Sequence, residues 1–237
     1  MNISRSLALK IHFILDQLLP PFLRDSKIFM WFPLKIIFSS KTKDMMEFKE
    51  SIPFMSYEEY VSVYETTAPY HISRETDINP SCIQAILKYI IGPSVLEVGC
   101  GRGFLARKIK TAGYDVTATD IVFNERLNEL DETIKFFNAD MSALPFDNNV
   151  FDTVICTHVL EHVIDFKKSV SELRRVAKKR LIIVVPKQRT YRYTFDLHLR
   201  FFPYIHSFLL EMYPLQKGSF FCADVGGDIY YRENINE

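Results

Sequence analysis

The chain has 237 residues, a length that fits one α/β domain with an appended segment and that suffices to bury a substantial core. Lysine plus arginine number 29, as do aspartate plus glutamate, so the sequence lacks the positive charge that gathers nucleic acid. Its four cysteines are scattered without a C-x-x-C pair, which disfavours a zinc site and a disulfide framework. The composition therefore predicts a cytoplasmic protein with no metal site and no nucleic-acid partner.

Residues 1–50 contain no glycine and are predicted to be helical. An apolar stripe at helical spacing runs along the first 19 residues until Pro20-Pro21 ends it. A second apolar run, residues 28–38, is interrupted by a proline and a lysine and is too short to span a bilayer. Two interpretations stay open. We prefer a helical cap packed on the rest of the chain, and the alternative is peripheral contact with a membrane surface.

The middle of the chain alternates between helix and strand patterns. Asn79 is a suitable N-cap for a predicted helix from Pro80 to Ile91. Strands are predicted near 94–98, 114–119, 134–137, 151–156 and 180–185, and helices near 103–112, 124–130 and 164–178. This alternation predicts a parallel, doubly wound sheet. The last of these strands is β-branched throughout, so we expect it to be buried on both faces.

A pair of glycines predicts how the chain ends. Gly226-Gly227 separates the strand-like runs 219–225 and 228–231, and such a pair suits the positive φ angles of a tight turn. We therefore expect a C-terminal antiparallel hairpin.

A glycine-rich loop follows the first predicted strand, within the run Val-Leu-Glu-Val-Gly-Cys-Gly-Arg-Gly-Phe at residues 95–104. The loop glycines are Gly99, Gly101 and Gly103. Glycine allows a tight turn and lets a ligand lie against backbone N–H groups where a Cβ would collide. Phe104 stands where a dinucleotide-binding fold has its third glycine. Glu97, two positions before the first glycine, would repel a pyrophosphate but suits an ammonium or sulfonium ligand.

This loop resembles the first motif of the class I S-adenosylmethionine-dependent methyltransferases, which reads acidic-x-G-x-G-x-G. Asp120 ends an apolar-alternating run 23 residues after Glu97, where the family has its ribose-binding carboxylate. The run Asn138-Ala-Asp-Met141 matches the adenine-site element. Residues 151–162 match the fourth strand and the following helix start, in the D-x-V-x-x-x-x-V-L-E-H form of the small-molecule branch. Together these elements cover about residues 90–186.

The resemblance implies a Rossmann-like methyltransferase fold. We expect a doubly wound, mostly parallel seven-stranded sheet with a helical N-terminal extension and a C-terminal antiparallel hairpin. The extension would comprise residues 1–90 and the methyltransferase domain residues 91–237. Within that domain, residues 187–217 would form an insertion on the acceptor side.

The resemblance also implies which residues bind S-adenosylmethionine. The set is Glu97, Gly99, Cys100, Gly101, Gly103, Asp120, Ile121, Asp140, Met141, His158 and Arg74. Asp120 would accept hydrogen bonds from both ribose hydroxyls. Asp140 would accept from the adenine amino group, and Met141 would supply a backbone N–H and an apolar wall. Arg74 precedes the first strand by about twenty residues, where related enzymes place a basic group near the cofactor carboxylate; a surface salt bridge is the alternative.

Methyl transfer from a sulfonium requires mainly that donor and acceptor be held close and aligned. If an O or N acceptor needs a base near neutral pH, histidine is the natural choice. His198, with Asp196 two residues before it, is the first candidate, and the two share one face if the segment is strand-like. His158 is the second candidate. An aromatic lid with incidental polar residues is the alternative interpretation of this segment, and Glu161-His162, at the start of the next helix, is expected to be structural.

The acceptor stays open at this stage, as do the methylated atom and the oligomeric state. The aromatic, cation-rich residues 187–203 suit a sugar or other polar metabolite. The apolar N-terminal segment would better explain a lipid-linked or quinone-type acceptor at the membrane. We expect residues 1–50 to cover the acceptor site and residues 187–203 to line it.

Three rival functions are disfavoured by the same residues. A nicotinamide-dependent oxidoreductase would need the missing third glycine. A nucleic-acid base methyltransferase would show an N/D-P-P-Y-type tetrapeptide where this chain has Thr157-His-Val-Leu160. A non-catalytic adaptor docking through residues 1–50 would have no need of the intact glycine loop and Asp120.

Overall fold

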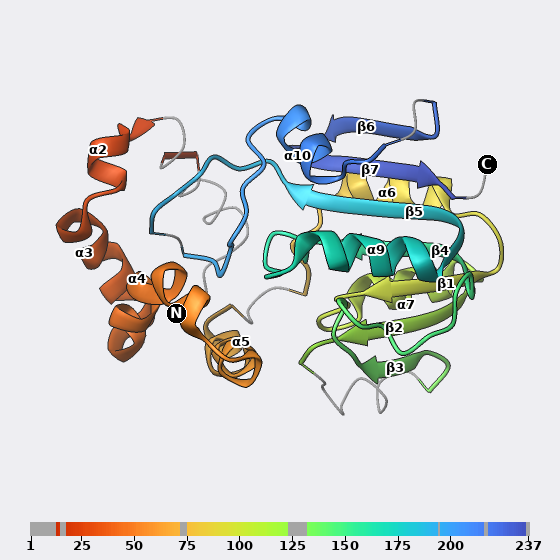
Figure 1. The fold of residues 1–237 in the computed structure, drawn as a ribbon, viewed down its shortest axis with the longest axis horizontal. Helices are drawn as coiled ribbons and strands as arrows, with labels where there is room; N and C mark the ends of the chain where they lie inside the picture. The colour runs from red at the N-terminus through yellow and green to blue at the C-terminus, as the bar shows by residue number, and fades with distance from the viewer. Residues whose placement is uncertain are drawn as a thin grey trace. The chain divides into compact units, whose positions relative to one another are not determined.

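The computed structural model describes residues 13–14, 18–71, 75–122, 132–193, 195–215 and 218–235. The chain forms two compact units (Figure 1). Unit 1 comprises Met1–Glu75 and Gln188–Phe201, and unit 2 comprises Thr76–Lys187 and Phe202–Glu237. Arg74, the helix predicted near 124–130, and residues 1–12 and 15–17 of the predicted N-terminal helix lie outside the described residues.

Unit 2 is built on a seven-stranded sheet with the order β3-β2-β1-β4-β5-β7-β6. Its strands are β1 Ser94–Val98, β2 Asp115–Asp120, β3 Lys135–Asn138, β4 Phe151–Thr157, β5 Ala177–Pro186, β6 Phe220–Val225 and β7 Asp228–Asn234. Strands β1 to β5 pair in parallel, whereas β7 runs antiparallel to both β5 and β6. The predicted parallel core and terminal hairpin are therefore confirmed. Strand β5 begins three residues earlier than predicted.

Helices cover both faces of this sheet. They are α6 Pro80–Tyr89, α7 Phe104–Thr111, α9 Phe166–Val176 and α10 Ile205–Glu211. Buried residues of α6 and α7 form one core cluster with the sheet, and buried residues of α9 and α10 form the other. Leu181 and Ile182 of β5 belong to opposite clusters, and β5 is fully buried from Leu181 to Val185, as expected of a central strand. The side chain of Asn79 accepts from Cys82 N and caps α6 as predicted.

Unit 1 is helical in its N-terminal part. Its elements are α2 Pro21–Arg24, α3 Lys27–Phe38, α4 Thr42–Ser51 and α5 Tyr57–His71, with 3-10 turns η2 Ser39–Lys41 and η3 Ile52–Phe54. The apolar run 28–38 lies within α3, which accommodates Pro33. Among the described helices, none combines the length and the apolar composition needed to cross a bilayer.

The core of unit 1 combines two segments far apart in the sequence. Buried side chains of α3, α4 and α5 pack with Tyr191, Tyr193 and Leu197. The described residues of 188–201 adopt no helix or strand. The condition for Asp196 and His198 to share one face of a strand is therefore not met. What holds this segment in unit 1 is its aromatic and aliphatic side chains.

Candidate functional site

The glycine loop connects β1 to α7 at the carboxyl edge of the sheet, where ligands of open α/β folds bind. All three loop glycines have positive φ. At Gly99, an added Cβ would lie 2.1 Å from Cγ2 of Val159, so the close approach of the segment after β4 excludes a side chain there. At Gly101, an added Cβ would meet no heavy atom of the described residues within 4 Å. The sequence predicted that a ligand explains these glycines, but at Gly99 the packing of the protein itself is sufficient.

Backbone hydrogen bonds fix the loop against β2. The N–H groups of Gly99 and Cys100 both donate to Thr119 O, at 2.7 and 2.9 Å. The Cys100 side chain is buried, and this burial raises the pKa of its thiol above the ordinary range. Cys100 thus contributes to the site through its backbone rather than through a reactive sulfur.

Asp120 ends β2 with its carboxylate directed at the loop. Oδ2 accepts from Gly101 N at 2.7 Å, and Oδ1 accepts from Val122 N at 3.0 Å. Removal from solvent raises the pKa of Asp120, while these backbone donors act in the opposite direction. The next residue, Ile121, is held through its carbonyl, which accepts from Asn138 Nδ2 at 2.7 Å. Each carboxylate oxygen has a second lone pair, so Asp120 retains the capacity to accept from a diol.

Glu97 lies in β1 beneath the loop and is 2% exposed. Burial and, to a lesser extent, the nearby charge of Asp120 raise the pKa of its carboxyl to about 8, although the Ala106 N–H and Arg107 act to lower it. Oε2 has no hydrogen-bond partner among the residues that the structure describes. A buried carboxylate oxygen without a donor is costly, and a cationic ligand group would relieve that cost.

The adenine-site element follows β3. Asp140 Oδ1 accepts from Ser142 N at 2.7 Å, and Asp140 O accepts from Ala143 N at 3.0 Å, so the segment forms a tight turn. The side chain of Met141 is buried in the same core cluster as β4. An apolar wall at Met141 is thus present, with the half-buried Asp140 beside it.

His158 follows β4 directly and has an unusual backbone, with φ +55°. Its N–H donates to Val184 O at 2.9 Å. Nε2 lies 3.4 Å from Oδ2 of Asp228, and Nδ1 lies 3.7 Å from Oε1 of Glu161. Burial lowers the pKa of His158, but the contact with Asp228 and the charges of Glu161 and Asp77 outweigh it, so the pKa is raised. An imidazolium has no lone pair to accept a proton, so this environment favours a donor over a base.

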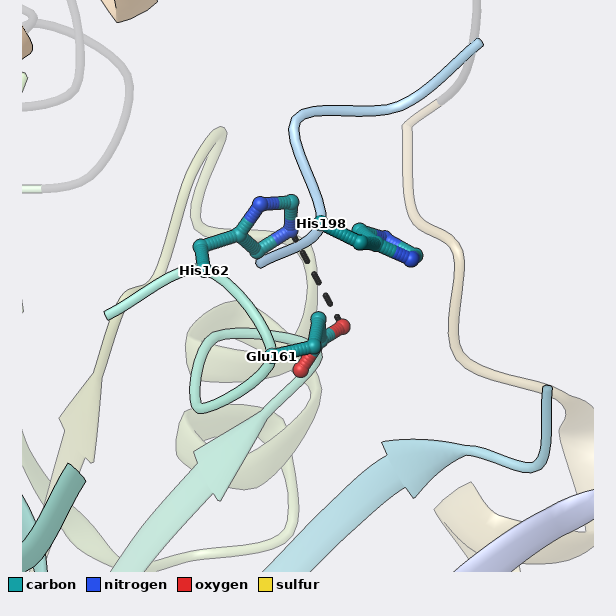
Figure 2. Close-up of side chains that lie close together, drawn as sticks. All are labelled: Glu161, His162 and His198. Atoms are coloured by element: carbon teal, nitrogen blue, oxygen red, sulfur yellow. Dashed lines mark ion pairs between the residues drawn. The ribbon is translucent and has the colours of Figure 1, made fainter. Parts of the chain in front are cut away.

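Glu161 and His162 lie in a turn and not at a helix start, because α9 begins only at Phe166. The predicted helix boundary was therefore too early. The Glu161 side chain is fully buried, and its Oε1 lies 3.9 Å from His162 Nε2 (Figure 2). Since His158 also contacts Glu161, this carboxylate sits beside two imidazoles and helps to hold the turn after β4.

Polar groups of unit 1 lie among the aromatic residues of its core. His198 Nδ1 lies 2.7 Å from Oε1 of Gln188. Lys49 of α4 donates from Nζ to Tyr191 O at 2.6 Å and lies 4.1 Å from the centre of the Phe201 ring. Burial lowers the pKa of Lys49 to about 7, although Asp196 and Asp25 act to raise it.

Sequence reasoning missed Lys49. The signal was present, because Lys49 follows Met45 by four positions and so lies on the apolar face of α4. A lysine in that position either extends its ammonium to solvent or is desolvated, and only the packing of residues 188–201 shows that it is desolvated.

Comparison with known proteins agrees with the geometry. Residues 96–185 match the family model described as a methyltransferase domain. The structure resembles that of Burkholderia thailandensis 1,6-didemethyltoxoflavin-N1-methyltransferase, solved with its substrate and S-adenosylhomocysteine, with a TM-score of 0.57 over 77% of this chain and 92% of that one at 20% identity. Residues 96–185 are thus similar to a methyltransferase domain, and the chain shares the fold of that enzyme.

Curated relatives match less than half of this chain. A demethylmenaquinone methyltransferase of Clavibacter sepedonicus is 29% identical over 123 residues, which are 47% of this chain and 49% of that protein. A malonyl-[acyl-carrier protein] O-methyltransferase of Buchnera aphidicola is 36% identical over 87 residues, which are 36% of this chain and 35% of that protein. The chain thus spans about half or less of the length of these relatives. Their names refer to different acceptors, so the matching segment specifies no acceptor.

Proposed function

We propose that this protein transfers a methyl group from S-adenosylmethionine to an O or N atom of a small-molecule acceptor. One observation carries the proposal. At the carboxyl ends of β1 and β2, the Asp120 carboxylate is bonded to Gly101 N, beside open space at Gly101, while Glu97 keeps a buried oxygen without a donor. This arrangement suits a ligand that carries both a diol and a positive charge.

S-adenosylmethionine supplies an activated methyl group through its sulfonium. The residues of the chain bind and orient. Asp120 has the lone pairs to accept from ribose hydroxyls, and Glu97 would lose its proton to pair with the cationic end of the cofactor. Asp140 and Met141 supply an acceptor and an apolar wall for adenine. These roles follow the family motifs, and the structure supports them by bringing Glu97, Asp120 and the loop together.

We further propose that unit 1 recognises the acceptor. Support comes from its shared core, since residues 188–201 and the N-terminal helices, both expected on the acceptor side, fold as one body. His198 is the proposed base for an acceptor that must lose a proton. Gln188 Oε1 can only accept, so Nδ1 of His198 carries the hydrogen and the lone pair of the neutral ring lies on Nε2.

A lipid-linked or quinone-type acceptor is a second candidate, and one observation supports it. Helix α3 exposes a row of large apolar side chains, which suits a lipid-linked or quinone-type acceptor at a membrane surface. The sugar or polar-metabolite acceptor rests on the aromatic and cationic residues of 187–203. A panel of both acceptor classes, assayed by release of S-adenosylhomocysteine, decides between them.

The cofactor assignment is tested by calorimetric titration of the full chain. We expect S-adenosylhomocysteine to bind with micromolar-order affinity and NAD to give no heat. Heat with NAD and none with S-adenosylhomocysteine would overturn the proposed function.

A further inference from the structure

Helix α3 is apolar on two opposite sides. Met30, Leu34 and Phe38, spaced by four, are 0% exposed in the core of unit 1. Ile37 is partly buried against the same core, whereas five other apolar side chains are exposed, by 79% for Ile28, 37% for Phe29, 43% for Trp31, 63% for Phe32 and 69% for Ile36. We call these five residues the α3 outer face. Surface helices of globular proteins are normally polar on the side away from the core, so this face requires an apolar partner.

The charges around the α3 outer face have one predominant sign. Helix α3 carries two lysines and no acidic residue, whereas Lys41 and Lys43 beyond it pair with Asp44 and Glu47. Lys27 and Lys35 lie on α3 itself and are exposed. Nζ of Lys35 lies 5.9 Å from the centre of the Trp31 ring, so its stem runs along an aromatic side chain while its charge stays at the edge of the face.

We propose that the α3 outer face docks on the surface of an anionic lipid bilayer. Apolar side chains would enter the boundary between headgroups and acyl chains, while the flanking lysines would meet anionic headgroups. Trp31 has the amphipathic ring that favours this interface. The 12 residues of α3 extend about 18 Å, short of a bilayer core of about 30 Å, so the helix would lie in the plane of the surface.

A second copy of the chain is the rival occupant. Lysine is depleted in the cores of protein–protein interfaces, and two such faces brought together would place like charges near each other. The combination of an apolar row and a lysine border therefore favours lipid. This docking goes beyond the proposed function, because it requires neither cofactor nor acceptor.

The full chain offers a direct probe, since Trp31 is its only tryptophan. Titration with phosphatidylcholine vesicles containing phosphatidylglycerol should shift the fluorescence of Trp31 to shorter wavelength and sediment the protein. Vesicles of phosphatidylcholine alone should bind less, and added salt should weaken the binding. No shift and no sedimentation with the anionic vesicles would overturn the proposal.

Matched variants locate the surface. Phe32→Ser should lower the affinity for anionic vesicles by about tenfold or more, because the phenylalanine side chain would no longer be available to enter the lipid. Phe54→Ser is the control, since Phe54 is 87% exposed in η3, outside the α3 outer face, and this variant should bind as the unaltered chain does. Equal loss in both variants would overturn the assignment of the surface.

Two further readouts separate the alternatives. A blue shift that appears with protein concentration in the absence of lipid, and that Phe32→Ser abolishes, would assign the face to a second copy and overturn the lipid proposal. Binding of S-adenosylhomocysteine, measured on the same samples, should be unchanged in Phe32→Ser. Failure of vesicle binding with normal cofactor binding would therefore count against the docking alone and not against the proposed function.

Discussion

The carboxylate of Asp120 and the backbone N–H of Gly101 form a hydrogen bond of 2.7 Å that joins the end of β2 to the glycine loop. The side chain expected to bind the ribose therefore also holds the loop in place. Because the other oxygen accepts from Val122 N, Asp120 organises the carboxyl ends of two neighbouring strands before any ligand arrives. We therefore expect substitutions at this position to affect both the shape of the loop and the affinity for cofactor.

Asp120→Ala should weaken binding of S-adenosylhomocysteine by about tenfold or more, since charge-assisted hydrogen bonds to the ribose contribute roughly 1.5–3 kcal/mol each. Asp120→Asn keeps one oxygen acceptor and should lose less. Calorimetry gives the dissociation constants, and circular dichroism checks that both variants are folded. Unchanged affinity in a folded Asp120→Ala protein would show that the ribose is held elsewhere.

The pKa of about 8 at Glu97 predicts a pH dependence of stability. In the folded chain this carboxyl keeps its proton up to about pH 8, whereas in the unfolded chain it loses the proton near 4.5. The unfolded state therefore binds fewer protons in that window, and Glu97 lowers the free energy of unfolding by at most about 1.4 kcal/mol for each pH unit of increase. Below pH 4.5 the contribution is constant.

Glu97→Gln should flatten that decline. Urea unfolding between pH 5 and 8 should show a smaller loss of stability in the variant than in the unaltered chain, in the absence of ligand. The same variant should bind S-adenosylhomocysteine more weakly, because the amide cannot lose a proton to pair with the ammonium group as the carboxyl can. A variant with the same pH slope as the unaltered chain would contradict the raised pKa.

Gly99 and Gly101 provide a matched pair of substitutions. Gly99→Ala places a Cβ 2.1 Å from Val159 at φ +75°, so we expect a loss of stability well above the ~1 kcal/mol of a left-handed backbone alone. Gly101→Ala meets open space at φ +52° and should cost only about that backbone term, yet it should impair cofactor binding. Thermal unfolding and calorimetry measure the two effects.

A second substitution tests the cause at Gly99. Combining Gly99→Ala with Val159→Ala should recover part of the stability, because it removes the atom that the new Cβ would meet. Additive losses in the double variant would show that backbone conformation, rather than the contact with Val159, sets the cost.

Two changes test whether unit 1 recognises the acceptor, and they differ in their expected effects on turnover. Deletion of residues 1–50 removes α3 and α4 from the core of unit 1, so turnover should be abolished while binding of S-adenosylhomocysteine persists. His198→Ala should lower kcat by a factor of about 100 or more at nearly constant cofactor affinity if His198 is the base. Normal turnover in His198→Ala, with loss in Lys49→Met, would transfer the role of base to Lys49.

Much of unit 2 could be predicted from the sequence. Each predicted feature depends on one short segment of the sequence. These features are the strands buried on both faces, the glycine loop and the Gly226-Gly227 turn. The approach of Val159 to Gly99 and the desolvation of Lys49 depend on segments that meet only in the folded chain. The irregular conformation of residues 188–201 could not be predicted either, since their aromatic side chains suit a strand as well as a packed coil.

The core of unit 1 sets an order of events for a chain emerging from a ribosome. Lys49 can form its hydrogen bond to Tyr191 only after a further 142 residues have been synthesised. At a synthesis rate of about 5–20 residues per second, that delay is roughly 7 to 30 seconds. During this interval the apolar side chains of α3 that later face the core lack the tyrosines and leucine that cover them. The N-terminal helices therefore cannot complete their core until residues 191–197 have been synthesised.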